Sequence, residues 1–73
     1  MEEFAYRKIA ADLRGQIDCG DLASGDPVPS ARQLSQEYGV AMETSRKALR
    51  LLVADGVIVQ VSKGLPFYVA DMN

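Results

Sequence analysis

The sequence predicts a small, mainly α-helical domain that ends in a β-hairpin. Two observations predict the helices: apolar residues recur at three- and four-residue spacing before residue 20, and a serine-capped segment, a glycine and another apolar-periodic segment lie between residues 30 and 54. The third observation is that the chain after Gly56 is dense in β-branched and aromatic residues. Three helices and a hairpin in this order form a winged helix-turn-helix domain, which we expect over residues 1–73.

The first helix is expected at about residues 3–18. Ile9, Leu13 and Ile17 form an apolar stripe along one face, which is typical of a helix that packs on a core. Cys19 follows the helix and is interpreted as a partly buried small apolar residue, because the chain has no second cysteine and no histidine to activate it.

Residues 20–29 are rich in glycine, proline, serine and aspartate, and are expected to connect the first two helices. Leu22 and Val28 are the apolar residues that would anchor this connection to the core. A short strand at residues 27–28 is an open alternative to an irregular path.

Ser30 marks the start of the second helix, which is expected at about residues 31–38. Ser30 and Gln33 match a capping box, in which each side chain accepts a hydrogen bond from the backbone N–H of the other residue. Leu34 is assigned to the core. Gly39 is expected to end the helix, because glycine tolerates positive φ.

The third helix is expected at about residues 42–54, after a short turn in which Val40 is buried between the helices. Apolar spacing assigns four residues to the inner face: Ala48, Leu49, Leu52 and Val53. The outward face then carries Met42, Glu43, Thr44, Arg46, Lys47 and Arg50. Residues 57–61 and 67–69 are expected to form the strands of the wing hairpin, at about residues 57–70.

The composition narrows the classes of function. No apolar run approaches the roughly 18 residues that a membrane span needs, and the acidic N-terminus does not resemble a signal peptide. We therefore expect a cytoplasmic protein without membrane contact. One cysteine and no histidine make a metal site unexpected. The chain shows no nucleophile-and-base pair and no phosphate-binding glycine loop, so we expect no enzyme and no cofactor.

The charge is distributed unevenly along the chain. The formal net charge is −2, which by itself argues against binding to nucleic acid. Residues 1–29 carry six acidic and three basic side chains, whereas residues 30–65 carry five basic and three acidic ones. The basic excess therefore coincides with the two helices that would contact DNA.

The outward residues of the third helix are the candidates for DNA contact. Arg46 is the candidate for base reading, because arginine can donate two parallel hydrogen bonds to guanine O6 and N7. Thr44 lies near the helix N-terminus, where a phosphate is favoured. Lys47 and Arg50 are expected to neutralise phosphates. For all three basic residues the alternative is a solvated surface side chain.

Further candidates lie on the second helix and in the wing. In a helix-turn-helix the first helix of the motif crosses the DNA backbone, which places Arg32 near a phosphate or a groove edge. Lys63 and Gly64 are expected at the tip of the wing, where a lysine beside a glycine can reach the minor groove. An ordinary hairpin turn is the alternative interpretation of this pair.

With these residues in view, residues 6–69 resemble the DNA-binding domain of the GntR family of bacterial transcription regulators. The residues that carry the resemblance are Ile9, Leu13, Ile17, Gly20, Gly25, Asp26, Pro29, Ser30, Arg32, Gln33, Leu34, Tyr38, Gly39, Val40, Thr44, Arg46, Ala48, Leu49, Leu52, Asp55, Gly56, Val57, Ile58, Gly64 and Val69.

The resemblance implies a transcription regulator that binds double-stranded DNA at a palindromic operator, as a homodimer. A repressor is the expected form, located in the bacterial cytoplasm and on the nucleoid when bound, although an activator is also compatible with the family. By position, the DNA contacts of the family correspond to Arg32, Thr44, Arg46, Lys63 and Gly64.

The chain departs from the family pattern at the presumed reading positions. Family members usually have Ser-Arg where this chain has Ala41 and Met42, and often a small polar residue in place of Glu43. The wing usually reads Gly-basic-Gly-Thr-Phe, whereas residues 64–68 read Gly-Leu-Pro-Phe-Tyr. Fewer basic contacts imply weaker binding, a shallower salt dependence or an unusual sequence choice. Glu43 can stabilise the helix N-terminus, accept from cytosine N4 or repel phosphates.

Family members also carry a C-terminal effector-binding domain, which these 73 residues do not include. The chain is either an isolated DNA-binding module or an excised domain, and its methionine start favours a small natural regulator. The second hypothesis for function is a winged-helix protein-interaction module that has lost DNA binding. Its motivation is the acidic balance together with Met42 and Glu43 on the presumed reading face.

Overall fold

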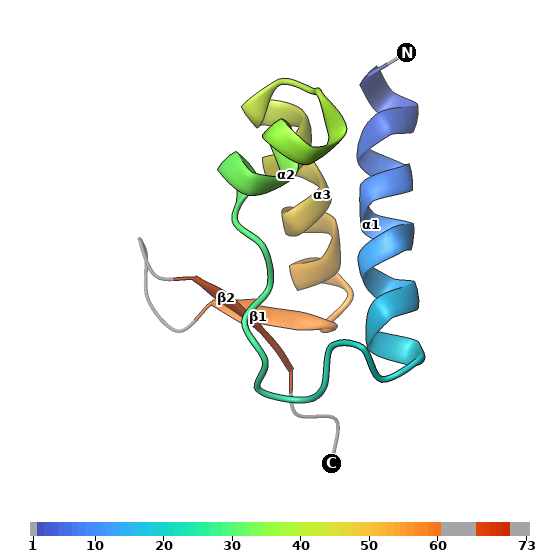
Figure 1. The fold of residues 1–73 in the computed structure, drawn as a ribbon, viewed down its shortest axis with the longest axis vertical. Helices are drawn as coiled ribbons and strands as arrows, with labels where there is room; N and C mark the ends of the chain where they lie inside the picture. The colour runs from blue at the N-terminus through green and yellow to red at the C-terminus, as the bar shows by residue number, and fades with distance from the viewer. Residues whose placement is uncertain (1, 61–65, 71–73) are drawn as a thin grey trace.

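The computed structural model describes residues 2–60 and 66–70 of the chain. It contains three helices, α1 (Glu2–Asp18), α2 (Ala31–Tyr38) and α3 (Met42–Ala54), followed by strands β1 (Ile58–Gln60) and β2 (Phe67–Val69). Figure 1 shows α1 and α3 side by side, with α2 near the start of α3 and the hairpin near its end. This order confirms the predicted fold class, and each helix lies within one residue of its expected range.

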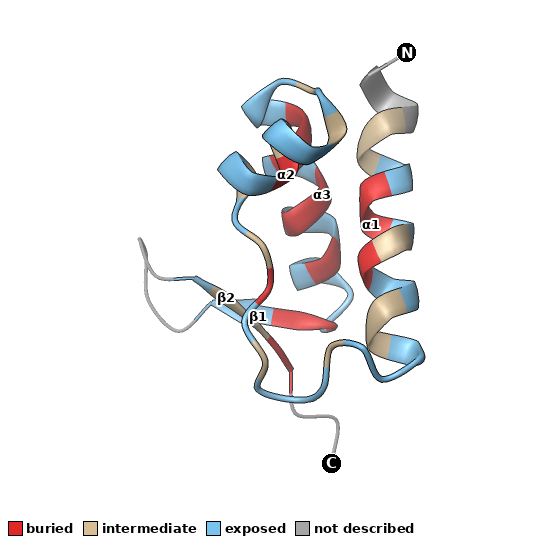
Figure 2. Cartoon of the chain, in the orientation of Figure 1, coloured by how far each residue is buried: buried red, intermediate tan, exposed pale blue. Residues whose placement is uncertain are grey.

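The core lies where the inner faces of the three helices meet the hairpin. Its large apolar side chains, each at most 2% exposed, are Ile9, Leu13, Leu34, Leu49, Leu52 and Ile58. Figure 2 shows the buried residues of α1 and α3 on the sides of the helices that face each other. Burying one such side chain contributes about 1.5–3 kcal/mol relative to leaving it exposed, so these residues largely determine how α3 is held.

Polar contacts on the surface supplement the apolar packing of α1. The Tyr38 hydroxyl donates to Oδ2 of Asp12 at 2.8 Å and so joins α2 to α1. The Arg14 guanidinium lies 3.2 Å from Oδ2 of Asp55, just after α3. Both contacts join residues that are far apart in the sequence. One connects α1 to α2, and the other connects α1 to the residue that follows α3.

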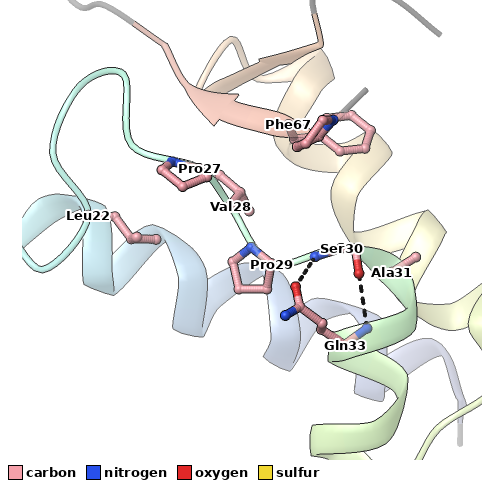
Figure 3. Close-up of a pocket in the computed structure, with 9 residues that line it drawn as sticks. Leu22, Pro27, Val28, Pro29, Ser30, Ala31, Gln33 and Phe67 are labelled. Carbon is pink, nitrogen blue, oxygen red and sulfur yellow. Dashed lines mark hydrogen bonds between the residues drawn. The ribbon is translucent and has the colours of Figure 1, made fainter. Parts of the chain in front are cut away.

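The start of α2 is determined by the predicted capping box. Ser30 has extended backbone angles, φ −73° and ψ 164°, and its Oγ accepts from the N–H of Gln33 at 3.2 Å. The Ser30 N–H in turn donates to Oε1 of Gln33 at 3.0 Å, and Figure 3 shows both hydrogen bonds. The two bonds satisfy backbone donors that the first turn of a helix leaves unpaired.

The hairpin is a two-stranded antiparallel sheet in which Ile58 pairs with Val69 and Gln60 with Phe67. The connection between α1 and α2 runs along the free side of β2. There the Val28 N–H donates to the Phe67 carbonyl at 2.8 Å, and the Val69 N–H donates to the Asp26 carbonyl at 2.9 Å. These bonds form an isolated antiparallel bridge between Pro27 and Tyr68. Of the two alternatives for residues 27–28, a short strand or an irregular path, the structure therefore favours a short extended segment.

The expected burial of Val53, Cys19 and Val40 is corrected by the structure. Val53, assigned to the inner face, is 40% exposed, because it lies three residues after Arg50 and seven after Arg46, on the outward side of the helix. Cys19 is exposed rather than partly buried, since it lies on the turn that follows the last residue of α1. Val40 is half-buried: it packs against the core without being enclosed by it.

Gly15 offers a way to stabilise α1. It lies inside the helix, and a Cβ built at this position meets no atom within 4 Å. Alanine is more favourable than glycine in a helix interior by about 0.8–1 kcal/mol. We therefore expect Gly15→Ala to raise the free energy of unfolding by about 0.5–1 kcal/mol in urea titrations. The matched control is Gly56→Ala, which should destabilise, because Gly56 has φ +76°. Equal shifts of the same sign would contradict this account.

Tyr38 is expected to make stability depend on pH in the alkaline range. Burial and the hydrogen bond to Asp12 raise the pKa of Tyr38 to about 12. The unfolded chain ionises this hydroxyl near pH 10, so its contribution is present below pH 10 and is lost as the pH rises to about 12. Tyr38→Phe should cost about 1 kcal/mol at pH 7. The difference from wild type should shrink between pH 10 and 12, and an unchanged difference in urea titrations would count against the contact.

Candidate DNA interface

The turn between α2 and α3 sets the relative positions of these helices. Gly39 adopts the left-handed conformation, φ 68° and ψ 36°, and its N–H donates to the Ser35 carbonyl. Ala41, the N-cap residue before α3, has an extended backbone, and no side chain caps this helix. The backbone therefore changes direction within three residues, and the first turn of α3 lacks the side-chain acceptor that α2 has.

A part-buried pair of hydroxyl groups joins α2 to α3. Ser35 Oγ and Ser45 Oγ lie 2.9 Å apart, and Ser45 is completely buried. A buried hydroxyl that finds a partner avoids the free-energy cost of an unpaired polar group. This pair was not predicted from the sequence, although Ser45 lies four residues before the core residue Leu49, a spacing that points to the inner face.

The outward face of α3 carries most of the predicted contact residues but not all of them. The residues exposed on this face are Met42, Glu43, Arg46, Lys47 and Arg50. Thr44, which was expected among them, is 6% exposed. The correction has a simple cause, because Thr44 lies four residues before Ala48 and eight before Leu52, in the same buried row of the helix.

An acidic side chain lies within the basic face. Oε1 of Glu43 is 3.5 Å from a guanidinium nitrogen of Arg46 and 3.9 Å from one of Arg50. The side chains of the three residues are 71%, 54% and 68% exposed, respectively. Ion pairs as exposed as these contribute little to folding, so the arginines remain available to an external partner.

Lys47 points away from this group and toward α1. Its ammonium nitrogen lies 4.7 Å from the centre of the Tyr6 ring, a cation–π contact, and Arg7 approaches the same ring at 5.9 Å. Lys47 remains exposed. The predicted basic face is therefore divided into one part near α2 and the hairpin and another part near α1.

Arg46 and Arg50 lie beside the start of α2 and the hairpin. They line a cleft of about 400 Å³ with Ala31, Leu49, Gln60 and Phe67. Arg32 is exposed in the first turn of α2, next to Ala31 of this cleft. The fold thus brings Arg46 and Arg50 together at this cleft, and Arg32 follows one of its lining residues in the sequence. Lys63 and Gly64 lie outside the described residues.

A second cleft, of about 630 Å³, lies at the start of α2 and is the one shown in Figure 3. Leu22, Pro27, Val28, Pro29 and Phe67 contribute to its wall. Over residues 2–60 and 66–70, no group of three histidine, cysteine or acidic side chains is placed to hold a metal ion. Nor is any helix in this part of the chain long and apolar enough to cross a membrane.

These features define the winged helix-turn-helix class of DNA-binding domain: a capped α2, a glycine turn, an outward basic face on α3 and a hairpin that follows it. Residues 5–69 match the model of the bacterial regulatory proteins of the gntR family. The chain belongs to the GntR family, which confirms the resemblance found in the sequence.

Curated relatives are transcriptional repressors and regulators. The chain is 39% identical over 66 residues to the mannosyl-D-glycerate transport/metabolism system repressor MngR of Escherichia coli (strain K12), covering 90% of this chain and 27% of the repressor. It is 34% identical over 56 residues to the HTH-type transcriptional repressor NagR of Bacillus subtilis (strain 168), covering 77% and 23%. The chain thus spans about a quarter of the length of these relatives.

Solved structures share the fold. YtrA from Sulfolobus acidocaldarius, a GntR-family transcription factor, superposes with a TM-score of 0.82 at 38% identity, over 93% of this chain and 57% of YtrA. The DNA-binding domain of AraR, in complex with operator ORX1, superposes with a TM-score of 0.81 at 29% identity, over 89% of this chain and 77% of that one.

The uncapped start of α3 leads to a prediction about stability. Serine at an N-cap accepts a hydrogen bond from the first turn and is worth about 1 kcal/mol relative to alanine. Ala41 already has the extended backbone that an N-cap needs. Ala41→Ser should therefore raise the free energy of unfolding by about 1 kcal/mol in urea titrations. Ala41→Val, which adds bulk without an acceptor, is the control, and an equal gain from valine would rule out capping as the cause.

Proposed function

We propose that this chain is the sequence-specific DNA-binding module of a cytoplasmic bacterial transcription regulator, which inserts α3 into the major groove of double-stranded DNA. The observation that carries the proposal is the outward face of α3. Arg46 and Arg50 are exposed there, beside the N-terminus of α2, while the opposite face of the helix is buried in the core. An α-helix in the major groove presents one face to the base edges and is held by the protein from behind.

In this proposal the residues of the face divide the contacts between bases and phosphates. Arg46, one turn into α3, reads a guanine through paired hydrogen bonds to O6 and N7. Arg50 and Arg32 contact the phosphates on either side, and the positive end of the helix dipole at the N-terminus of α2 favours the same anions. Lys47 adds positive charge near α1. Thr44 retains a contact only through the small exposed part of its side chain.

The proposed partners are a palindromic operator and a second copy of the chain, with repression as the proposed effect. The named repressors among the relatives support this, as does the AraR domain that was crystallised with its operator. Two copies related by a two-fold axis would place their α3 helices about one turn of DNA apart, which is why an operator for such a dimer has two half-sites.

Arg46→Ala tests the base contact. A paired arginine–guanine contact discriminates by about 1–3 kcal/mol, so the variant should lose roughly 5- to 150-fold in affinity for a duplex selected by the wild type from a random pool. Binding to a scrambled duplex should change much less. Fluorescence anisotropy titrations at fixed salt provide both values.

The matched control is Arg14→Ala, which removes another exposed guanidinium, paired with Asp55 at the far end of α3. Its effect on both duplexes should be small. If Arg46→Ala behaves like Arg14→Ala, Arg46 reads no base. Flat titrations of the wild type at low salt would instead favour a protein-interaction module.

A further inference from the structure

A carboxylate occupies the middle of the surface that is proposed to contact DNA. Glu43, Arg46 and Arg50 lie at positions i, i+3 and i+7 of α3, and therefore form one row along the same side of the helix. Both arginines approach the same oxygen, Oε1 of Glu43, at 3.5 and 3.9 Å. One carboxylate is thus shared by the two arginines that are best placed to contact DNA.

Folding stability gives no reason for this arrangement. The three side chains are more than half exposed, and ion pairs of this kind contribute little in water. In a complex with DNA the situation changes, because the water around the row is displaced and each charge then depends on the partners that remain. The consequence of the shared carboxylate therefore concerns binding rather than folding.

We propose that Glu43 is a specificity-determining residue of the DNA interface, which orients Arg46 toward a base and competes with the phosphates for Arg50. This rests on the proposed function. On a duplex with guanine in the right place, Arg46 keeps Glu43 as one partner and directs its other N–H groups to the base. On other sequences the carboxylate lies close to phosphates with no base contact to compensate for the repulsion. Unspecific complexes are therefore weakened more than specific ones.

The salt dependence of DNA binding gives the expected size of the change in affinity when the charge of Glu43 is removed. In Glu43→Gln the carboxylate charge that competes for Arg50 is removed, so Arg50 neutralises its phosphate fully, which amounts to at most one additional phosphate contact. One additional phosphate contact steepens the decline of log K with log salt by about 0.9. Between 50 and 200 mM salt, this corresponds to an additional loss of affinity of about 3.5-fold.

The experiment compares wild type, Glu43→Gln and Glu37→Gln on two duplexes over this range of salt. Glu37 is an exposed residue of α2, and its substitution changes the net charge by the same amount without touching the row. Glu43→Gln should tighten binding to a scrambled duplex by about threefold or more at 50 mM salt and tighten binding to the selected duplex less. The ratio of the two affinities should fall, whereas Glu37→Gln should leave this ratio unchanged.

Each outcome decides the proposal. An affinity ratio and salt slope equal to those of Glu37→Gln overturn it. A large loss on the selected duplex alone, with the scrambled duplex unaffected, also overturns it, because Glu43 then accepts directly from a base. Suppose that the wild type is selective, that Arg46→Ala removes this selectivity and that Glu43→Gln does not change it. In that case this inference fails, while the proposed function stands. If the wild type binds no DNA, both fail.

A measurement without DNA tests the arrangement independently. The Nε–Hε resonances of Arg46 and Arg50 in the free protein should shift in Glu43→Gln and stay in place in Glu37→Gln. Unfolding curves should show both variants folded, with Glu37→Gln matching the wild type and Glu43→Gln slightly less stable, because Glu43 lies in the first turn of α3 and favours the helix dipole. Unshifted arginine resonances in folded Glu43→Gln would show that the carboxylate does not hold the arginines, which overturns the proposal.

Discussion

The rest of the structure depends on the close packing of α3 against both other helices. Ser45 and Ala48, two small residues, are completely buried on its inner face, and Leu49 and Leu52 fill the space around them. Small side chains at a helix crossing let the backbones approach, so the orientation of α3 about its own axis has little freedom. That orientation determines which residues reach solvent. The outward row from Glu43 to Arg50 is therefore a consequence of the core.

Local patterns in the sequence were sufficient for the elements of the fold. The capping box at Ser30 and the positive φ of Gly39 each depend on residues a few positions apart, which is why both could be predicted. The hairpin was predicted from the β-branched residues that come after Gly56. Which residues of α3 point inward was harder to predict, because an apolar side chain is not always an inward one. A polar residue, Thr44, lies in the buried row, and an apolar one, Val53, does not.

The candidate site could be predicted from the sequence in part. Arg46 and Arg50 were expected on the outward face, and they are exposed there. The contact of Lys47 with Tyr6 joins residues from α3 and α1 and has no signature in the local sequence. The same holds for the hydroxyl pair of Ser35 and Ser45, which depends on how two helices cross. Such contacts depend on how the helices pack against one another, which local sequence patterns do not predict.

The connection that runs beside β2 has a consequence for how the chain behaves with other copies of itself. In a strand-like segment, alternate N–H groups point to opposite sides. Val28 donates to β2, so the N–H groups of its two neighbours would face away from the sheet. Both neighbours, Pro27 and Pro29, are prolines and have no N–H. The edge that the connection forms beside β2 therefore lacks the donors that another strand would need, which disfavours the addition of a strand on this side of the sheet.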